Sequence, residues 1–315
     1  MIHAFSGGVG GAKLARGLVD VVPAQALSIV VNTGDDFDHL GLRIMPDFDS
    51  VAYAVAGLND EQRGWGRADE TWHCKESLAS LGVDTWFSLG DRDMATHLLR
   101  LSLLKSGLDT TSACAEMARR MGIACQLVPM ADDPVTTVVL TDEGELPFQD
   151  YFVRRGCTPR VKGFRFAGVE RAAPSAAWFA SLSPDQTDGV LLCPSNPYVS
   201  IDPILALAGV RSRLRDVPVV AVSPVIAGAS VKGPLAKMLG EMGQACTPVA
   251  IAAHYQDILD GIVIDSRDAA HEPELRRLGL RVAVCDTLMT SRDVSRELAR
   301  RSLQLLAECG ASRAA

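Results

Sequence analysis

The sequence lacks the features that mark nucleic-acid-binding proteins and membrane proteins. Its 31 lysines and arginines are outnumbered by 38 aspartates and glutamates, which gives a net charge of −7. Nucleic-acid-binding proteins usually carry excess basic residues, so we expect no nucleic-acid partner. The uncharged run nearest to a membrane helix, Val217–Val231, contains two prolines and is shorter than the ~18–20 residues required. We therefore expect no membrane partner.

Paired cysteines are also missing. Eight cysteines lie scattered along the chain with no C-x-x-C pair, so we expect buried free thiols rather than disulfides or a zinc site. The N-terminal residues have neither the basic patch nor the long apolar core of a signal peptide, and the first lysine or arginine is Lys13. These patterns predict a cytoplasmic protein.

The chain does contain 48% apolar and 22% charged residues, which is typical of a globular protein. Short apolar runs alternate with helical patterns, which predicts a mainly parallel sheet wrapped by helices. The predicted strands are Ile2–Phe5, Ser28–Val31, Trp86–Leu89, Gly189–Cys193, Val217–Val222, Gly261–Ile264 and Val282–Cys285. The predicted helices lie near Ala12–Val21, Met94–Lys105, Asp202–Leu214, Pro234–Met242 and Arg292–Glu308.

Two stretches fit this alternation less well, and we interpret them as insertions into one α/β domain that spans residues 1–315. The first insertion, about 46–83, is polar and partly helical. The second, about 126–184, contains a predicted hairpin of Thr136–Leu140, the turn at 142–144 and Phe148–Arg154. The predicted core comprises about 1–45, 84–125 and 185–310.

A glycine-rich loop follows the first predicted strand and leads into a helix. It contains Gly7, Gly8, Gly10, Gly11 and Lys13. Glycines let the backbone approach a ligand closely, and a helix N-terminus presents free N–H groups, so the loop favours phosphate binding. It matches neither a Walker A loop nor a complete G-x-G-x-x-G fingerprint. The alternative is a tight turn that only packs the helix on the strand.

Two acidic motifs follow the second predicted strand. Asp35 and Asp36 form an adjacent pair that favours a divalent cation, a ribose contact or a solvated turn. Asp47 and Asp49 lie two residues apart, a spacing that shares one side of an extended chain. The alternative for this second motif is a helix cap at Asp49 or Ser50.

Two further motifs follow the third and fourth predicted strands. The first is Gly90-Asp91-Arg92-Asp93, which is followed by Thr96 and His97; an Asp cap or an internal ion pair would explain it without a ligand. The second is Pro194-Ser195-Asn196-Pro197, a rigid loop with two polar residues at its tip. Because ligands bind beyond the carboxyl ends of strands in open α/β sheets, we expect all these motifs to meet at one edge.

These motifs, in this order, resemble those of the 2-phospho-L-lactate transferase family (CofD/FbiA-like). The resemblance spans almost the whole chain and includes Ser223-Pro224, Lys232-Gly233-Pro234 and Asp286-Thr287. It implies a Rossmann-like three-layer α/β/α core with helical and β-hairpin insertions, Mg²⁺ as cofactor, and a role in coenzyme F-420 biosynthesis. The implied reaction transfers a phospho-three-carbon-acid group from a guanosine diphosphate-linked donor to the 5′-hydroxyl of the deazaflavin Fo and releases GMP. The acid is of the phospholactate, phosphoenolpyruvate or phosphoglycerate type.

Phosphoryl-type transfer requires positioning and charge neutralisation, and we assign the residues accordingly. The expected catalytic residues are Asp49, Asp36 and Arg92. The expected Fo-side residues are Asp49, Ser50, Arg92, Asp93, Thr96 and His97. The expected nucleotide- and phosphate-binding residues are Gly7, Gly8, Gly10, Gly11, Lys13, Ser195 and Asn196. The expected Mg²⁺ ligands are Asp35, Asp36 and Asp49.

Two other functions stay open at this stage. A strand, a glycine loop and an acid after the second strand also occur in NAD-dependent dehydrogenases, although the broken fingerprint argues against that class. A related family of UDP-sugar-binding regulators likewise begins with a glycine loop and has paired aspartates. For the transferase we expect two small-molecule partners, Fo and the guanylated donor, and a homodimer.

Overall fold

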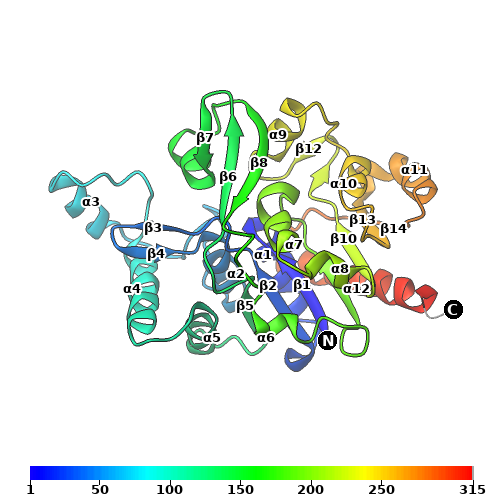
Figure 1. The fold of residues 1–315 in the computed structure, drawn as a ribbon, viewed down its shortest axis with the longest axis horizontal. Helices are drawn as coiled ribbons and strands as arrows, with labels where there is room; N and C mark the ends of the chain where they lie inside the picture. Colours follow the sequence, from blue (N-terminus) through cyan, green and yellow to red (C-terminus); the bar gives the residue numbers. More distant parts are fainter. Residues whose placement is uncertain (314–315) are drawn as a thin grey trace.

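The computed structural model describes residues 1–313, and a seven-stranded sheet runs through its centre (Figure 1). Its strand order is β14-β13-β10-β9-β1-β2-β5, and every pair of neighbours is parallel. The bounds are β1 Ile2–Ser6, β2 Leu27–Val31, β5 Gln126–Pro129, β9 Gly189–Leu192, β10 Val219–Val222, β13 Gly261–Asp265 and β14 Arg281–Cys285. The chain builds outward from β1 in one direction and then from β9 in the other. The topological switch point therefore lies between β1 and β9, where open α/β sheets bind ligands.

Helices cover both faces of this sheet, which confirms the three-layer Rossmann-like architecture. Adjacent residues of one strand point to opposite faces: Ala4 joins one buried apolar cluster and Phe5 joins the other. On the first face α1 packs against both α2 and α12, and α5 packs on β5. These helices are α1 Gly8–Val19, α2 Pro46–Ala56, α5 Thr110–Arg120 and α12 Arg292–Arg313. The second face carries α6 Ala176–Phe179, α7 Asp202–Ala206, α8 Val210–Leu214, α9 Leu235–Glu241, α10 Pro248–His254 and α11 Glu272–Arg277.

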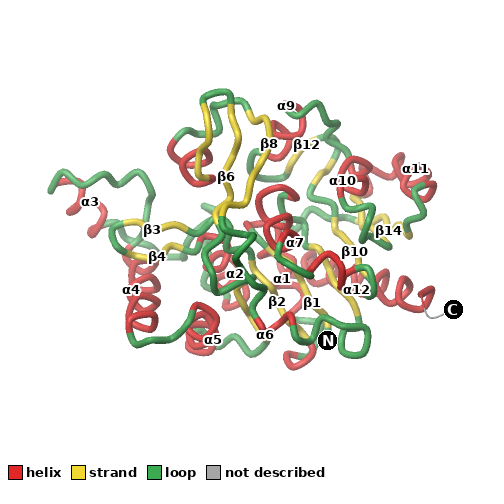
Figure 2. Tube along the Cα trace, viewed as in Figure 1, coloured by secondary structure: helices red, strands yellow, loops and turns green. Residues whose placement is uncertain are grey.

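Two smaller parts stand away from the central sheet (Figure 2). The first contains the hairpin of β3 Phe37–His39 and β4 Leu42–Ile44, together with α3 His73–Ser80 and α4 Asp91–Lys105. The second is an antiparallel sheet of order β7-β6-β8, formed by β6 Thr136–Thr141, β7 Gly144–Pro147 and β8 Val161–Ala167. A further short hairpin, β11 Val225–Ile226 with β12 Ala229–Ser230, follows β10.

The prediction of a strand at Trp86–Leu89 is wrong. These residues form no strand, and Trp86 and Phe87 pack instead against Phe37 of β3, with ring centroids 5.6 and 4.9 Å away. The sheet position expected for this segment is occupied by β5, a strand that we had placed within the second insertion. Burial against the β3–β4 hairpin explains the apolar run, because an apolar run alone does not distinguish a strand from a buried loop.

Three other elements differ from their predicted form. The second hairpin strand, predicted at Phe148–Arg154, is β7, and Asp150–Arg154 forms a π-helical turn. The predicted helix Asp202–Leu214 is broken into α7 and α8 at Gly209, which has a positive φ of 81°. Helix α2 packs on α1 in the central core, although the first insertion was expected to begin at residue 46.

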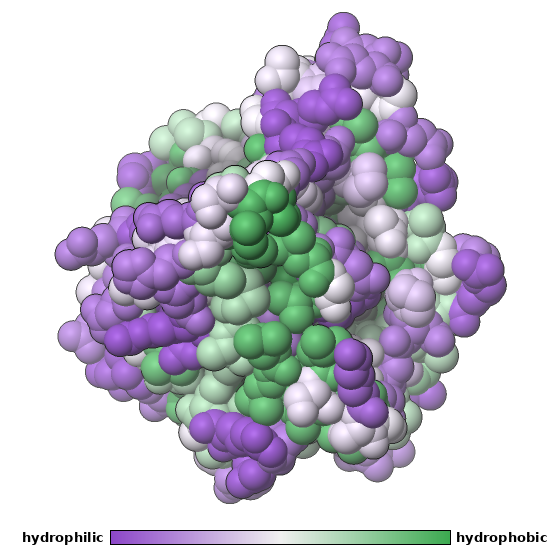
Figure 3. All heavy atoms as spheres, turned by 90° about the vertical axis from the view of Figure 1, so that its left-hand side faces the viewer, coloured by the Kyte–Doolittle hydropathy of each residue, from purple (hydrophilic) through white to green (hydrophobic). Residues whose placement is uncertain are grey.

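Helix α4 turns its polar face inward. Asp93, Thr96, His97 and Arg100 are buried, whereas Leu98 is 53% exposed. Figure 3 turns this side of the molecule toward the viewer and shows apolar side chains gathered among hydrophilic ones. Because polar residues are buried and an apolar one is exposed, polar contacts rather than apolar burial determine which face of α4 packs inward. No helix within residues 1–313 is both long and apolar enough to cross a membrane.

Candidate active site

A cavity of about 650 Å³ opens at the switch point of the sheet. Its walls come from the loops after β1, β2, β9, β10 and β14, from the first turn of α2 and from the segment after β7. The polar lining includes the glycine loop, Lys13, Asp35, Asp47, Ser50, Asn196, Ser223, Lys232 and Thr287. The aromatic lining consists of Trp65, Phe87, Phe148 and Phe152. Four of the five motifs therefore contribute residues to this cavity, whereas Gly90-Asp91-Arg92-Asp93 does not. The cavity combines charged and flat apolar surfaces.

The glycine loop is tighter than the sequence predicts, because α1 begins at Gly8 rather than at Ala12. Its glycines permit close contact with the loop after β9: a Cβ on Gly10 would lie 2.2 Å from the Pro194 carbonyl oxygen. A Cβ on Gly11 would lie 2.5 Å from the Ser195 hydroxyl, so Gly11 serves packing rather than lining the cavity. Gly7, Gly8 and Gly10 do line it, at the N-terminus of α1. The packing interpretation is thus confirmed for Gly10 and Gly11, and phosphate binding stays a prediction for the glycines that line the cavity.

Ser195 joins the two loops at the switch point. Its hydroxyl accepts a hydrogen bond from the Gly7 amide at 3.1 Å and donates one to the Gly7 carbonyl at 2.7 Å. Asn196 uses its side-chain oxygen to accept from the Tyr198 amide at 3.0 Å. The residues expected on the nucleotide side therefore hold the loops in place, and both still line the cavity.

Asp47 and Asp35 are the two carboxylates that line the cavity. Asp47 accepts hydrogen bonds from the Gly8 amide at 2.7 Å and from the Asn32 side chain at 2.9 Å. Burial raises the pKa of Asp47 to about 6 against the lowering effect of these two donors. Burial, with the charges of Asp47 and Asp36 beside it, also raises the pKa of Asp35 well above its ordinary value. Asp35 Oδ1 is buried with no hydrogen-bond partner among residues 1–313.

Asp36 and Asp49 face arginines instead of the cavity. Asp49 forms a buried ion pair with Arg100, whose side chain is 1% exposed. Asp36 Oδ2 lies 3.6 Å from Arg43 Nη2. Within residues 1–313 no group of three or more His, Cys, Asp or Glu side chains has the arrangement of a metal site. The structure thus does not gather Asp35, Asp36 and Asp49 around one point.

The residues expected on the Fo side are split by the structure. Ser50 lines the cavity. Asp93, Thr96 and His97 lie buried on α4, where His97 is placed between Asp49 and Asp93 at 3.7 and 3.5 Å. They do not line the cavity, and His97 contacts Asp49 in the first turn of α2.

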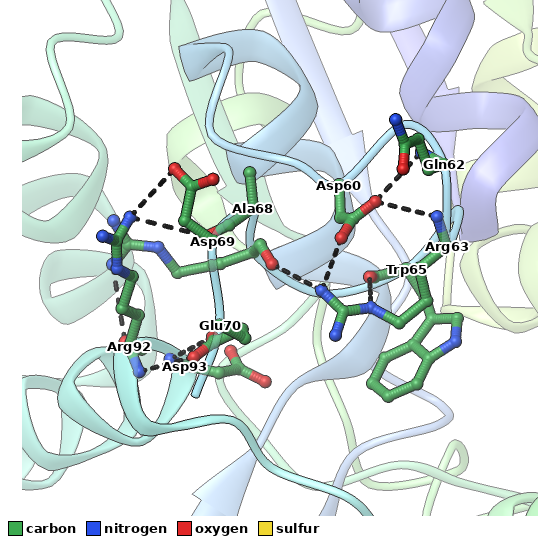
Figure 4. Close-up of polar contacts among 10 residues, drawn as sticks. Asp60, Gln62, Arg63, Trp65, Ala68, Asp69, Glu70, Arg92 and Asp93 are labelled. Atoms are coloured by element: carbon green, nitrogen blue, oxygen red, sulfur yellow. Dashed lines mark hydrogen bonds and ion pairs between the residues drawn. The ribbon is translucent and has the colours of Figure 1, made fainter. Parts of the chain in front are cut away.

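Arg92 does not line the cavity, and its side chain, drawn in Figure 4, is 54% exposed. Its guanidinium pairs with Asp69 at 3.4 Å.

The helix caps in the structure differ from those predicted from the sequence. Glu70 accepts from the backbone amides of Arg92 and Asp93, both at 2.7 Å, so the N-terminus of α4 is capped from a distant loop. Helix α2 begins at Pro46, so neither Asp49 nor Ser50 caps it.

Two lysines supply positive charge to the cavity. Lys13 donates to the Met289 carbonyl at 2.8 Å, and Lys232 reaches the Gly64 carbonyl at 3.4 Å. Burial, together with the nearby charge of Lys232, lowers the pKa of Lys13. Two cations that repel each other across a cavity form a favourable setting for an anion.

Our assignment from the sequence missed Asp47, Asn32, Lys232 and the aromatic wall as site residues. Asp47 and Lys232 stood in recognised motifs, and the motif position gave a signal for both. Asn32 lies directly beside the recognised acid pair and donates to Asp47. Phe148 and Phe152 gave no signal, because their stacked contact at 5.4 Å depends on a π-helical turn that the sequence pattern does not reveal.

Comparison with known proteins shows the family of the chain. The family model described as 2-phospho-L-lactate transferase CofD matches residues 2–293. A 2-phospho-L-lactate transferase from Methanosarcina barkeri is 41% identical over 295 residues, which cover 94% of this chain and 95% of the relative. A phosphoenolpyruvate transferase from Streptomyces coelicolor is 38% identical over 315 residues, which cover 98% of this chain and 98% of the relative.

A solved structure shows a similar fold at low sequence identity. It is a member of the UPF0052 family from Bacillus halodurans, with a TM-score of 0.63 and 15% identity over 96% of this chain and 98% of its own. This likeness concerns the fold alone. The family match and the relatives near 40% identity decide the relationship: the chain is a transferase that belongs to the 2-phospho-L-lactate transferase (CofD) family.

Proposed function

We propose that this protein transfers a phospho-three-carbon-acid group from a guanosine diphosphate-linked donor to the 5′-hydroxyl of Fo, with release of GMP, in coenzyme F-420 biosynthesis. The hydroxyl oxygen attacks the phosphorus distal to guanosine, and the bond between that phosphorus and the GMP oxygen breaks. Membership of the CofD family supports this class of reaction. The donor and the acceptor are argued from the cavity.

The observation that carries the proposal is a single cavity with two chemically different regions. One region combines the N-terminus of α1 with Lys13 and Lys232, which suits a diphosphate. The other is formed by Phe87, Phe148 and Phe152, which suit a flat aromatic ring system such as a deazaflavin. A volume of about 650 Å³ lies within the range of cofactor-sized sites.

The pair of carboxylates formed by Asp35 and Asp47 is better explained by a bound Mg²⁺ than by a site that holds no ligand. Asp35 Oδ1 has no hydrogen-bond partner within residues 1–313, and two buried carboxylates beside each other repel. Asp35 and Asp47 would hold the ion. Asp36 and Asp49, which we also expected as ligands, pair with Arg43 and Arg100 instead. Bound Mg²⁺ would neutralise charge on the phosphate oxygens. Asp47 would keep its hydrogen bond from Gly8 and so fix the glycine loop against the diphosphate.

Family membership favours the transferase over the two alternatives. A dehydrogenase and a UDP-sugar-binding regulator are both compatible with the glycine loop, but the relatives near 40% identity are named as transferases. The relatives carry two different donor acids in their names, phospholactate and phosphoenolpyruvate, at similar identity. The donor of this chain is therefore an experimental question.

Mass spectrometry of the product tests the proposal. Purified protein is incubated with Mg²⁺, Fo and, in turn, lactyl, enolpyruvyl and glyceryl guanosine diphosphate donors. We expect an Fo phosphodiester and GMP with at least one donor, and no product after chelation with EDTA until Mg²⁺ is restored. Absence of product with all three donors, beside an active control enzyme, would reject the proposed function.

A further inference from the structure

A second, smaller cavity adjoins the main one behind Lys13. Its volume is about 170 Å³, and it shares Lys13, Ser50, Gly64, Trp65 and Lys232 with the main cavity. Beyond this shared wall it reaches a side of α1 that the main cavity does not touch. There it is lined by Arg16, and by Ser291 and Ser295 near the start of α12.

The side cavity carries more positive than available negative charge. Arg16 lies one helical turn after Lys13, so both cations lie on one face of α1. Two acids, Asp60 and Glu61, also line the cavity. Asp60 is taken up within its own loop, where it accepts from the Gln62 and Arg63 amides and pairs with the Arg63 guanidinium at 2.7 Å (Figure 4).

Arg16 still has hydrogen-bonding capacity. The Arg16 side chain is 19% exposed, and its Nη1 pairs with the exposed carboxylate of Glu61. Its Nε is buried and has no hydrogen-bond partner within the described residues 1–313. A guanidinium offers five N–H donors in a fixed fork, so the pair with Glu61 leaves donors for a second carboxylate.

A folded loop, residues 59–66, forms one wall of the side cavity. The Ala68 amide donates to the Leu58 carbonyl at 2.8 Å, which closes the loop at its base. Trp65 at the tip is held by the Arg63 guanidinium, 4.8 Å from its ring centroid. Figure 4 shows both side chains on this loop. Trp65 lines both cavities and so marks the boundary between them.

We propose that the side cavity binds the carboxylate of the donor's three-carbon acid and that Arg16 is the residue that selects for it. This inference rests on the proposed function. The acid is attached to the phosphate distal to guanosine, so it must lie next to the diphosphate, and Lys13 and Lys232 line the boundary between the two cavities. Arginine recognises carboxylates through paired N–H donors, and 170 Å³ accommodates a three-carbon acid.

Equilibrium binding in the absence of Fo tests the proposal without turnover. The probes are GDP, a lactyl guanosine diphosphate donor, and the isopropyl ester of GDP, in which a methyl group replaces the carboxylate. Calorimetry of the wild-type protein should give tighter binding of the lactyl donor than of the isopropyl ester, on the order of tenfold to a hundredfold. In Arg16→Gln this difference should disappear while GDP affinity stays within about twofold of the wild type, because GDP lacks the acid.

Glu61→Gln is the matched control, because it breaks the same ion pair from the other side. If Arg16 binds the carboxylate, Glu61→Gln keeps or strengthens the preference for the lactyl donor. If Arg16 only braces the loop, both variants weaken all three probes alike, and this outcome overturns the inference. Equal affinity of the wild-type protein for the lactyl donor and the isopropyl ester also overturns it. Failure of the proposed function is a separate result, namely no Fo product from a donor that binds.

Discussion

The backbone amide of Gly8 donates a hydrogen bond to Asp47 Oδ1 at 2.7 Å, which joins the glycine loop to the first turn of α2. The two residues lie 39 positions apart, and their contact places an acid directly at the N-terminus of α1. A Cβ on Gly7 would lie 2.4 Å from the other carboxylate oxygen, so the loop and the carboxylate are in close contact. Asp47 therefore has a fixed position beside the surface that we assign to the diphosphate.

We predict that Asp47→Asn lowers turnover on the order of a hundredfold and raises the Mg²⁺ concentration required for half-maximal rate. The amide keeps the size of the side chain but removes the charge that would hold the cation. The measurement is the rate of GMP release against Mg²⁺ concentration. Asp38→Asn is the control, because Asp38 is an exposed acid, with its side chain 77% exposed, on the nearby strand β3. Equal behaviour of the two variants would contradict a cation site at Asp47.

The pH dependence of stability should differ between the wild type and Asp47→Asn. The pKa of Asp47 is about 6 in the folded protein and 3.8 in its ordinary state, so the folded protein holds this proton more tightly. As the pH rises from below 4 to above 6, the unfolded chain loses the proton first and the free energy of unfolding falls. Asp47→Asn lacks this effect. Without Mg²⁺, its melting temperature relative to the wild type should rise between pH 4 and pH 7; a constant difference would mean that the Asp47 pKa is ordinary.

Removal of the Asp49 side chain should lower the free energy of unfolding strongly and should change the turnover of the folded protein much less. Asp49→Ala leaves the Arg100 guanidinium buried without its carboxylate partner, which typically costs about 3–5 kcal/mol. Asp49→Leu combined with Arg100→Met should recover much of this stability, because an apolar pair carries no desolvation penalty. Denaturant unfolding of both variants checks the prediction. Wild-type stability in Asp49→Ala, with a large loss of turnover, would return Asp49 to the reacting groups.

Gly10→Ala should distort the loop after β9. The added methyl group would meet the Pro194 carbonyl at 2.2 Å, and overpacking of this kind typically costs about 1–3 kcal/mol. GDP affinity should fall in the same variant because the amides at the start of α1 are displaced. Gly240→Ala is the control: no heavy atom outside its immediate helical surroundings lies within 4 Å of its added Cβ, so it should be neutral or gain up to ~1 kcal/mol. Similar losses in both variants would indicate a general effect of alanine rather than contact with Pro194.

The sequence was sufficient to predict six of the strands now seen in the sheet, because buried parallel strands are continuous apolar runs with polar loops at their ends. It did not distinguish Trp86–Leu89 from the true third strand, β5. Both segments are short and apolar, and only the contacts of Trp86 and Phe87 with Phe37 show that the first is a loop packed on the β3–β4 hairpin. Local pattern does not encode such distant partners.

For the site, the sequence located the motifs but not the direction of each side chain. Asp35 and Asp36 are adjacent, yet Asp35 lines the cavity and Asp36 faces Arg43. Asp47 and Asp49 lie two residues apart in α2, so they point in different directions and do not share a side as they would in an extended chain. The partner that captures Asp49 is Arg100, a buried cation on α4 that no motif announced.

Fo-dependent release of GMP is the measurement that tests the central claim most directly. Purified protein, Mg²⁺ and a guanylated donor are mixed, and GMP is quantified before and after addition of Fo, in parallel for the wild type and Asp47→Asn. We predict one GMP for each Fo converted by the wild type, negligible release without Fo, and release on the order of a hundredfold slower in the variant. GMP release that does not depend on Fo, or an unchanged rate in Asp47→Asn, would contradict the account.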